Sequence, residues 1–485
     1  MPPLRILISG GGIAGHALAF WLARLRTTTP NAPSITVVER FPNLRATGLQ
    51  LDLRSAGLEV LRRMGPEREQ LFKDMAAPEQ GMQVVDKKGR RRALFPVRKG
   101  SDSKKQAQSL TSEFEIMRGD LCRGLYDATR AVASSTPTPE GDPPPVQYLY
   151  NTTIASLTPL PTGQISVTFT TPTNTDDTAH PPQTFDLVIG ADGQWSRTRQ
   201  LLFPDLPNTG MRRIPGFHIA YFTMPRPMAE GETEFLATTY VAPGRRGYMV
   251  RRHSPDEVQV MMTYMAPPNR SRGKSHPSGK STNPDENDEK NDPLTPIPRG
   301  DTPVEKAALT QLFTGAGWIT PDILAGMQKA DDFYLERLGL VQIPAWSRGR
   351  VGLVGDAAYC PTVLSGMGTT CAMVGAYVLA GEIGEYIRRA AGDGNEEEGG
   401  DGDGLERALK RYEERFRPFV EGMQEGIEER AEGQWAMTGS AFGIGVLNLM
   451  VGVASLLRVN VAAMFGIRET VKGWELPDYE GLWKD

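Results

Sequence analysis

Hydrophobic residues near the start of the chain occur in continuous runs rather than in alternation. Residues 4–9 and 34–39 are short apolar runs rich in β-branched residues, which is typical of buried parallel strands. Between them, residues 14–26 are rich in Ala and Leu and contain no helix breaker after Gly15, so they predict a helix. The chain therefore opens with a strand, a glycine-rich turn, a helix and a second strand.

Two later apolar runs also end in glycine and aspartate. Residues 185–193 end in Asp192-Gly193, and residues 349–358 contain Gly355-Asp356. Elsewhere apolar and polar residues alternate, which predicts a largely antiparallel sheet. The alternating segments are 81–95, with a hairpin break at Lys88-Gly89, and 217–224, 234–241, 247–252 and 257–264.

The C-terminal part is predicted to be helical. An apolar helix over 369–390 precedes an acidic, glycine-rich linker over 392–404 and a charged helix over 405–432. Residues 439–457 carry no charge and approach the length of a membrane span, but glycines and polar residues dilute their hydrophobicity. We expect a buried bridging helix there, with membrane association through 439–457 as the less favoured alternative.

Composition narrows the class of protein. A chain of 485 residues can bury a large core and is expected to hold more than one domain, and its net charge of −4 gives no electrostatic basis for binding nucleic acid. The three cysteines lack C-x-x-C spacing and the five histidines lack an H-x-x-x-H pair, so we expect neither a disulfide framework nor a metal site. The N-terminal apolar residues belong to the predicted strand and helix, so we expect no signal peptide and a cytoplasmic protein.

The glycine-rich turn fits the pattern G-x-G-x-x-G at Gly10, Gly12 and Gly15. Gly10 permits a tight turn, Gly12 lets the backbone approach a pyrophosphate, and Gly15 allows the helix and strand to pack closely. The strand before the turn and the helix after it favour a dinucleotide site over a structural turn.

Two further features support the dinucleotide site. Ile13 and Ala14 open the helix, whose free N–H groups and positive dipole end favour phosphate groups. Glu39 ends the second strand at about the expected distance, where its carboxylate can accept hydrogen bonds from ribose hydroxyls.

Three distant strands thus end in Gly10-x-Gly12, Asp192-Gly193 and Gly355-Asp356, as expected where a doubly wound sheet presents its carboxyl ends to a ligand. In this order they resemble the fingerprints of FAD-dependent monooxygenases of the aromatic hydroxylase type, whose fold is that of para-hydroxybenzoate hydroxylase. The resemblance covers residues 4 to about 390. Residues 47–53 and 355–361 are most similar to the tetracycline-inactivating branch, although Tyr359 stands where many members have histidine.

The resemblance implies an α/β fold in which a Rossmann-like FAD-binding domain is interleaved with a substrate domain built on a mostly antiparallel sheet, followed by C-terminal helices. The implied FAD-binding parts are 1–80, 118–210 and 346–391; the substrate parts are 81–117 and 211–345, with a disordered insertion over 265–301; the C-terminal helical region is 405–485.

The resemblance also implies which residues bind FAD. The pyrophosphate, the adenosine ribose, the ribityl chain and the isoalloxazine ring each have expected contacts. Those for the pyrophosphate are Gly10, Gly12, Ile13, Ala14 and Gly15; for the ribose, Glu39 and Arg40; for the ribityl chain, Asp356; near the ring, Gly366 and Gly368; elsewhere on FAD, Gly48 and Arg118; and near the phosphates and the NAD(P)H approach, Asp192. From the local sequence alone, Gly48 fits an ordinary turn equally well, and a helix-start arginine such as Arg118 is more often a surface residue.

The implied chemistry is that NAD(P)H reduces FAD, O2 adds at flavin C4a, and the resulting hydroperoxide transfers one oxygen to an electron-rich ring or enol. The chain has one G-x-G-x-x-G unit with strand and helix context and no redox cysteine pair, which fits NAD(P)H as a transient visitor. We expect the helix that starts near Gly366-Met-Gly368 to stabilise negative charge on the reduced flavin.

We expect a medium-sized aromatic or polyketide-like substrate. The sheet over 217–264 should form the wall above the flavin, which makes His218, Tyr221 and Tyr240 candidates for contacting the substrate or easing its deprotonation. Polar residues on a half-exposed sheet face are the simpler explanation of each.

Other functions remain open at this stage. An FAD-dependent oxidase, dehydrogenase or epoxidase on the same fold is the alternative enzyme, because a fold does not determine a reaction. A flavin-binding or membrane-docked protein without turnover is the alternative of another class. A dehydrogenase that uses only NAD is disfavoured, because it would not explain Gly355-Asp356-Ala-Ala.

Overall fold

In the computed structural model of the chain, the opening apolar runs begin a parallel sheet. Strand β1 (Arg5–Ser9), helix α1 (Ile13–Arg24) and strand β2 (Ser34–Val38) follow one another as the sequence predicts. The structure describes residues 3–25, 32–44, 48–96, 114–135, 144–172, 180–267, 292–391, 404–457 and 470–483.

Strand β1 lies within a six-stranded sheet of order β17-β18-β11-β1-β2-β7. Strand β11 (Leu187–Gly190) pairs in parallel with β1 on one side and with β18 (Val351–Leu353) on the other. The three strands that precede the glycine and aspartate motifs are therefore neighbours, and their carboxyl ends share one edge. The outer strands are β7 (Val146–Leu149), parallel to β2, and β17 (Ser347–Arg348), antiparallel to β18.

Helix α1 is central to the layers around this sheet. It packs against α4 (Arg118–Ser135) and α10 (Gly368–Ala390), and nearly all of its residues are buried because its neighbours surround it. Smaller elements complete this part of the molecule. They are α2 (Ala56–Arg63), α3 (Pro66–Asp74), α5 (Arg197–Leu202), α9 (Asp356–Tyr359), the pair β3 (Gln50–Asp52) and β6 (Glu115–Met117), and a sheet of β8 (Thr153–Pro159), β9 (Ile165–Thr170) and β10 (Gln183–Phe185).

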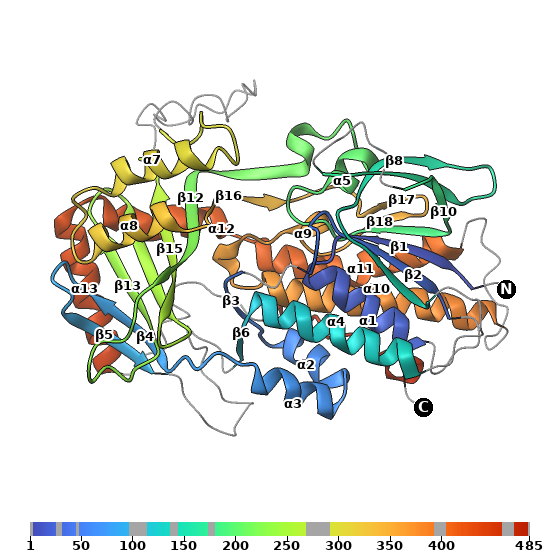
Figure 1. The fold of residues 1–485 in the computed structure, drawn as a ribbon, viewed down its shortest axis with the longest axis horizontal. Helices are drawn as coiled ribbons and strands as arrows, with labels where there is room; N and C mark the ends of the chain where they lie inside the picture. Colours follow the sequence, from blue (N-terminus) through green and yellow to red (C-terminus); the bar gives the residue numbers. More distant parts are fainter. Residues whose placement is uncertain are drawn as a thin grey trace.

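The alternating segments form a seven-stranded sheet at the other end of the molecule (Figure 1). Its order is β16-β12-β15-β14-β13-β4-β5, and all neighbours are antiparallel except β13 and β4, so the predicted α/β class and the largely antiparallel sheet are confirmed. The strands are β4 (Gly81–Val85), β5 (Arg91–Pro96), β12 (Met211–Pro225), β13 (Leu236–Ala242), β14 (Arg246–Arg252), β15 (Glu257–Met265) and β16 (Tyr334–Val341).

The two faces of this sheet have different neighbours. Helices α7 (Thr302–Phe313) and α8 (Thr320–Lys329) pack on one face against residues such as Phe222. Phe217 and Tyr221 on the opposite face pack with residues of the C-terminal helices and with Leu49 and Leu364, which belong to the FAD-binding part of the sequence. Because side chains alternate along a strand, this second face is the one turned toward the motif-bearing sheet.

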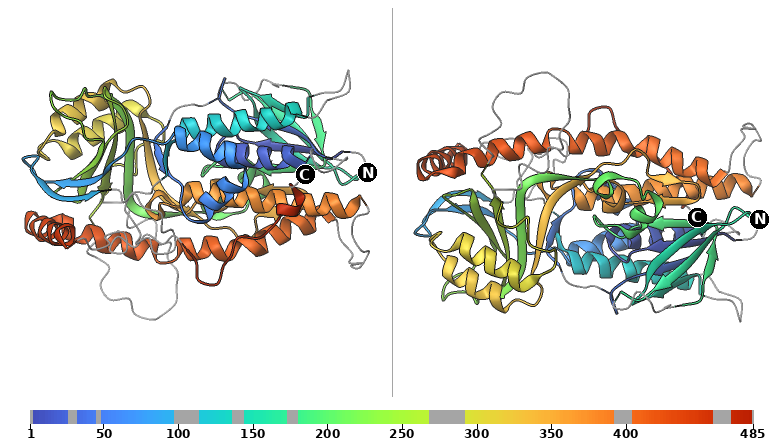
Figure 2. Two further views of the ribbon diagram at one scale, coloured as in Figure 1. Left: turned by 90° about the horizontal axis from the view of Figure 1, so that it is seen from below. Right: turned by 90° about the horizontal axis from the view of Figure 1, so that it is seen from above.

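The C-terminal helices α11 (Gly404–Gln424), α12 (Ile427–Ala436) and α13 (Ala441–Leu456) run along one long side of the molecule (Figure 2). The helix predicted over 405–432 is interrupted between α11 and α12, where Gly426 adopts a φ of 66°. Among the described residues, no single helix has the length and apolar character of a bilayer span, although α11–α12 and α13, bent by 113°, would pass such a test as a pair.

Two sequence predictions about irregular or apolar segments are wrong in part. The helix within 439–457 is not buried, since only Ile444, Val451 and Ala454 of α13 are buried. The insertion predicted to be disordered over 265–301 is ordered over 292–301, where Leu294 is fully buried beneath α7. Residues 268–291 lie outside the described part of the chain.

Candidate cofactor and substrate site

The carboxyl ends of β1, β11 and β18 meet through backbone hydrogen bonds. The Ala191 N–H donates to the Ser9 carbonyl over 2.7 Å, and the Val354 N–H donates to the Gly190 carbonyl over 2.9 Å. The three sequence motifs follow immediately after these contacts. The structure therefore brings together segments separated by more than a hundred residues, as the doubly wound interpretation predicts.

The first glycine motif is held in a conformation that side chains would prevent. Gly10 has a φ of 117°, and a Cβ at Gly15 would lie 1.9 Å from the Gly10 carbonyl oxygen. Gly15 therefore has the packing role predicted for it, because the first turn of α1 touches the end of β1. Gly12 differs, since a Cβ there would meet only Arg118 Nη2, at 3.7 Å.

The N-terminus of α1 is arranged as an anion site. Gly12 occupies the N-cap position without a side-chain cap, and Ile13 and Ala14 form the first turn, which contains no acidic residue. Its N–H groups and dipole therefore favour a phosphate. Glu39 lies beside this turn and accepts a hydrogen bond from the Gly11 N–H over 2.7 Å. The exposed Arg40 places its guanidinium over the Phe41 ring at 5.0 Å.

Arg118 begins α4 beside the glycine-rich turn. Its backbone N–H donates to the Leu49 carbonyl over 2.9 Å, and its side chain reaches Gly12. Gly48, with a φ of 138°, lies so close to Arg118 that an added Cβ would be 2.9 Å from the arginine Cδ. A larger residue at position 48 would collide with the Arg118 side chain, which is enough to explain the glycine. Gly48 therefore lies at the rim of the same site.

Asp192 has a structural role that the sequence did not indicate. Its carboxylate accepts hydrogen bonds from the Ser196 hydroxyl and from the N–H and hydroxyl of Thr198, the latter two at 2.9 Å. These contacts cap the start of α5. The carboxylate is therefore turned into the helix terminus, and its place near the cofactor phosphates stays a prediction. Among the described residues, no atom beyond the chain neighbours lies within 4 Å of a Cβ built on Gly193.

Arg199 joins the second motif to the third. It is fully buried, and its guanidinium donates to the backbone carbonyls of Gln194, Thr209 and Ala357 over 2.6–2.7 Å. The rigid guanidinium of Arg199 thus holds the segment after Asp192 and the segment after Asp356 in a fixed position relative to each other. The sequence showed Arg199 only as a helix-start arginine, because its three acceptors are backbone groups that leave no sequence signal.

The third motif packs directly against the first. A Cβ at Gly355 would lie 2.7 Å from the Ala14 Cβ, so the loop touches the start of α1. Burial raises the pKa of the Asp356 carboxyl, and the charges of Arg118 and Arg199 oppose that shift. Tyr359 points away from this site into the core, where its hydroxyl lies 3.1 Å from that of Tyr412.

The loop after the third motif leaves open space. Among the described residues, no atom beyond the chain neighbours lies within 4 Å of a Cβ built on Gly366 or Gly368, although Gly368 begins the 23-residue helix α10. The α10 N-terminus has neither a side-chain cap nor an acid in its first turn. Thr362 holds a φ of 57°, and its buried hydroxyl has no hydrogen-bond partner among the described residues. A strained residue and an unpartnered polar atom beside open space are typical of a ligand site.

The glycine loop, the loop at Thr362–Gly368 and the Glu39 carboxylate fit FAD. The uncapped N-terminus of α1 suits the pyrophosphate, and that of α10 suits an electron-rich ring. The glycines leave space that a flat ligand would fill. Asp356 and Arg118 lie near each other, since the charge of Arg118 lowers the pKa of the Asp356 carboxyl.

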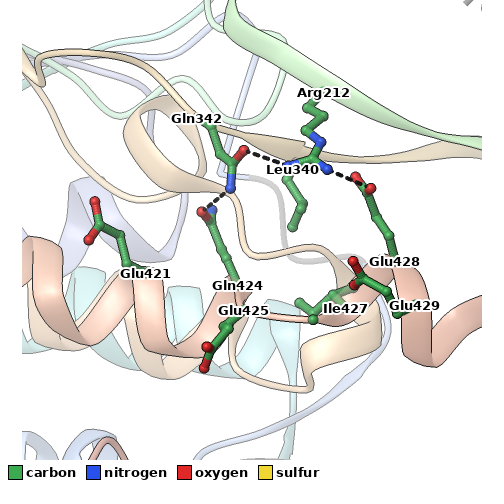
Figure 3. A pocket seen from close by; sticks show the side chains of 10 residues that line it. Arg212, Leu340, Gln342, Glu421, Gln424, Glu425, Ile427, Glu428 and Glu429 are labelled. Carbon is green, nitrogen blue, oxygen red and sulfur yellow. Dashed lines mark hydrogen bonds and ion pairs between the residues drawn. The ribbon is translucent and has the colours of Figure 1, made fainter. Parts of the chain in front are cut away.

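A groove of about 520 Å³ opens beside this region, between residues 41–44 and 48–49 on one side and the edge formed by β12 and β16 on the other. Tyr221 lines it and stacks on Tyr334, with ring centroids 4.9 Å apart. Aromatic and apolar side chains dominate such a wall, which suits a flat or hydrophobic molecule. A smaller hollow of about 240 Å³ at the break between α11 and α12 is lined by Arg212 and several glutamates, and includes none of the motif residues (Figure 3).

The three substrate candidates do not share one face of the sheet. Tyr221 faces the motif-bearing sheet, as predicted. His218 and Tyr240 face α7 and α8: the His218 ring lies 2.6 Å from the Asp292 carboxylate, and the Tyr240 hydroxyl donates to the Ala316 carbonyl. They are therefore structural residues of the opposite layer, because alternation along a strand sends neighbouring positions to opposite faces.

Glu336 is a residue on the site-facing side that the sequence analysis missed. Gln194, next to the second motif, donates to its carboxylate over 3.1 Å. Burial raises the pKa of Glu336 to about 7, which Arg299 opposes and Asp356 reinforces. The sequence offered one signal for Glu336, an acidic residue within the mainly apolar segment of β16. The side of the sheet to which Glu336 points is given only by the register of β16 against β12, in which Ile219 lies opposite Glu336.

Comparisons with known proteins find a relative over the full length of the chain. The chain is 39% identical over 487 residues to the FAD-dependent monooxygenase asL4 of Sarocladium schorii, and the match covers 100% of both chains. No family model matches the chain.

Solved structures share the fold over nearly the full length. The tetracycline destructase Tet(51) superposes with a TM-score of 0.62 at 24% identity, covering 99% of this chain and 100% of that one. HpxO of Klebsiella pneumoniae, solved with FAD and uric acid, superposes with a TM-score of 0.60 at 16% identity and 96% coverage of both chains. These similarities show the fold.

Gly12→Ala and Gly15→Ala are expected to separate cofactor binding from folding. The Gly12 methyl group would enter open space that FAD needs, so FAD affinity should fall about tenfold or more with little change in Tm. The Gly15 methyl group would overlap a backbone oxygen, so unfolding should occur at a clearly lower temperature. FAD titration by fluorescence and thermal unfolding test this; equal effects of both changes on Tm would contradict it.

Glu336→Gln is expected to change how stability depends on pH. The native carboxyl, with a pKa of about 7, keeps a proton that the unfolded chain releases near the usual glutamate value of 4.5, so native stability falls as pH rises through this window. The loss reaches up to about 3 kcal/mol above pH 7. Urea unfolding at several pH values should show a flatter profile for Glu336→Gln, whereas exposed Glu414→Gln should match the wild type. A Glu336→Gln profile that parallels the wild type would refute the assignment.

Proposed function

The chain belongs to the FAD-dependent monooxygenases, and from this premise we propose that it uses NAD(P)H and O2 to hydroxylate a medium-sized aromatic or polyketide-like molecule. The observation that carries the proposal is the meeting of three strand-end motifs beside an aromatic groove of about 520 Å³. When bound, FAD would accept reducing equivalents from NAD(P)H and activate O2 for transfer of one oxygen atom to the substrate.

We propose a specific distribution of FAD contacts. The first turn of α1 would hold the pyrophosphate, Glu39 with Arg40 the adenosine ribose, and Arg118 with Asp356 the central part of the cofactor. The open loop around Gly366 and Gly368 would face the isoalloxazine ring. There the α10 N-terminus favours negative charge, which lowers the free energy of an anionic reduced ring relative to a neutral one.

The division of labour between the two sheets is also a proposal. The six-stranded sheet and its helices would form the FAD-binding domain from residues 1–80, 118–210 and 346–391. The seven-stranded sheet would form the substrate domain, and its inward face would exclude water from the reacting atoms. Two partly buried contacts join this face to the other domain: Arg251 donates to the Glu79 carboxylate over 2.9 Å, and Gln259 donates to the Gly48 carbonyl over 3.1 Å.

Tyr221 is the proposed substrate-side residue of this face. Its ring lines the groove together with Tyr334 and residues 41–44 and 48–49, so it can stack on a planar substrate. Burial raises the pKa of its hydroxyl well above the usual value, which keeps the group neutral and able to donate a hydrogen bond at physiological pH.

Purified protein is expected to show flavin absorbance that bleaches with NADPH or NADH and returns in air. With substrate and isotope-labelled O2, one labelled oxygen atom should enter the product and the other should appear in water. An unlabelled oxidised product formed with hydrogen peroxide would instead identify an oxidase or dehydrogenase on this fold. A protein that cannot be reconstituted with FAD would refute the proposal.

Tyr221→Leu and Tyr240→Leu form a matched pair for the substrate wall. Both remove a buried ring and should lower Tm, because each leaves unfilled volume in its layer. Only Tyr221→Leu is expected to raise KM, by about tenfold, because only Tyr221 lines the groove. Steady-state kinetics below both unfolding transitions, with FAD content checked by absorbance, decide the matter; an equal KM in both variants would exclude Tyr221 from the wall.

A further inference from the structure

Helix α13 lies at the end of the molecule farthest from the N-terminus (Figure 2). Its exposed side chains form a continuous apolar stripe. At about 100° per residue, the exposed residues fall within roughly 120° of its circumference, opposite the buried Ile444 and Val451. Phe442 and Leu456 are each 83% exposed, and Leu449 is 68% exposed. The α13 stripe consists of Phe442, Val446, Leu449, Met450, Val453, Leu456 and Leu457.

Strongly basic residues lie next to this stripe. The hairpin between β4 and β5 has the sequence Lys87-Lys-Gly-Arg-Arg-Arg92, and its five basic side chains are exposed. Asp86 pairs with Arg92 and Glu234 with Arg91, which leaves an excess of positive charge. We call residues 87–92 the basic hairpin.

The stripe and the basic hairpin are rigidly connected. The Leu94 N–H donates to the Ser455 hydroxyl over 3.0 Å, and that hydroxyl donates back to the Leu94 carbonyl over 2.8 Å. Farther along α13, a Cβ at Gly452 would lie 3.1 Å from the Arg92 carbonyl oxygen. The helix that carries the stripe and the hairpin that carries the basic residues are therefore direct neighbours.

We propose that the α13 stripe and the basic hairpin form a docking surface for an anionic lipid bilayer. An uncharged helix lying in the interface would bury its apolar stripe among the acyl chains, while the neighbouring lysines and arginines would attract anionic headgroups. Such binding is peripheral and needs no membrane-spanning segment. It is independent of the reaction at the flavin site.

The charge pattern favours a bilayer over a second copy of the chain. A twofold dimer centred on the C-terminal part of α13, which contacts β5 at Gly452 and Ser455, would bring the basic hairpins of both copies close together, where like charges repel. An anionic surface instead complements the hairpin. The apolar stripe and the basic hairpin would then both bind the same bilayer.

Co-sedimentation with vesicles tests the proposal on the full-length holoenzyme. Wild-type protein should bind phosphatidylcholine vesicles that contain phosphatidylserine, and bind more weakly to phosphatidylcholine alone or at high salt. Leu449→Glu with Leu456→Glu should weaken binding about tenfold or more, because charges would enter the acyl region. Lys88→Glu with Arg90→Glu should weaken binding to the anionic vesicles only.

Matched controls distinguish this effect from general damage. Leu71→Glu on α3 and Lys329→Glu on α8 change an exposed leucine and an exposed lysine elsewhere, and should leave vesicle binding unchanged. FAD absorbance and Tm report whether each variant is folded. Absence of wild-type binding to either vesicle, or binding unaffected by the α13 change, would overturn the proposal. A concentration-dependent dimer in sedimentation velocity that Leu449→Glu abolishes would overturn it in favour of a second copy.

Discussion

The parallel pairing of β1, β11 and β18 is the constraint on which the candidate site depends. Backbone hydrogen bonds bring the ends of these strands together, although they are far apart in the sequence. Close contacts then fit the loops to one another: Gly15 touches the Gly10 carbonyl, and Gly355 touches Ala14. Each contact needs a residue without a larger side chain, so the same small residues that allow packing also leave backbone N–H groups accessible to a ligand.

The seven-stranded sheet supplies the second half of the site through its alternation. Tyr221 and Glu336 point toward the motif-bearing sheet, while His218 and Tyr240 point toward α7 and α8. Successive side chains of a strand point to opposite faces of the sheet, so a strand between two layers carries a different set of residues on each face. Here the outer layer is bound by apolar packing and by the His218–Asp292 contact, and the inner layer combines aromatic rings with buried polar groups.

The cofactor side was readable from local sequence, whereas the substrate side was not. The glycines at 10, 12 and 15 lie in consecutive elements whose order alone predicts a helix N-terminus facing phosphate. Asp192 has a second role that the sequence did not indicate, because its carboxylate accepts hydrogen bonds from Ser196 and Thr198 at the start of a helix. Residues 292–301 belong to the segment predicted to be a disordered insertion, yet the burial of Leu294 and the contact of Asp292 with His218 order them.

The sequence by itself determined the α/β class, the two kinds of sheet and the first phosphate-binding turn, because apolar periodicity and glycine placement act over a few residues. Tertiary structure decided which face of the second sheet meets the cofactor site, that Arg199 joins two loops, that Glu336 lies beside Gln194, and that α13 remains exposed. These outcomes depend on strand register and on contacts between residues far apart in the chain, and neither leaves a signal within a local stretch of sequence.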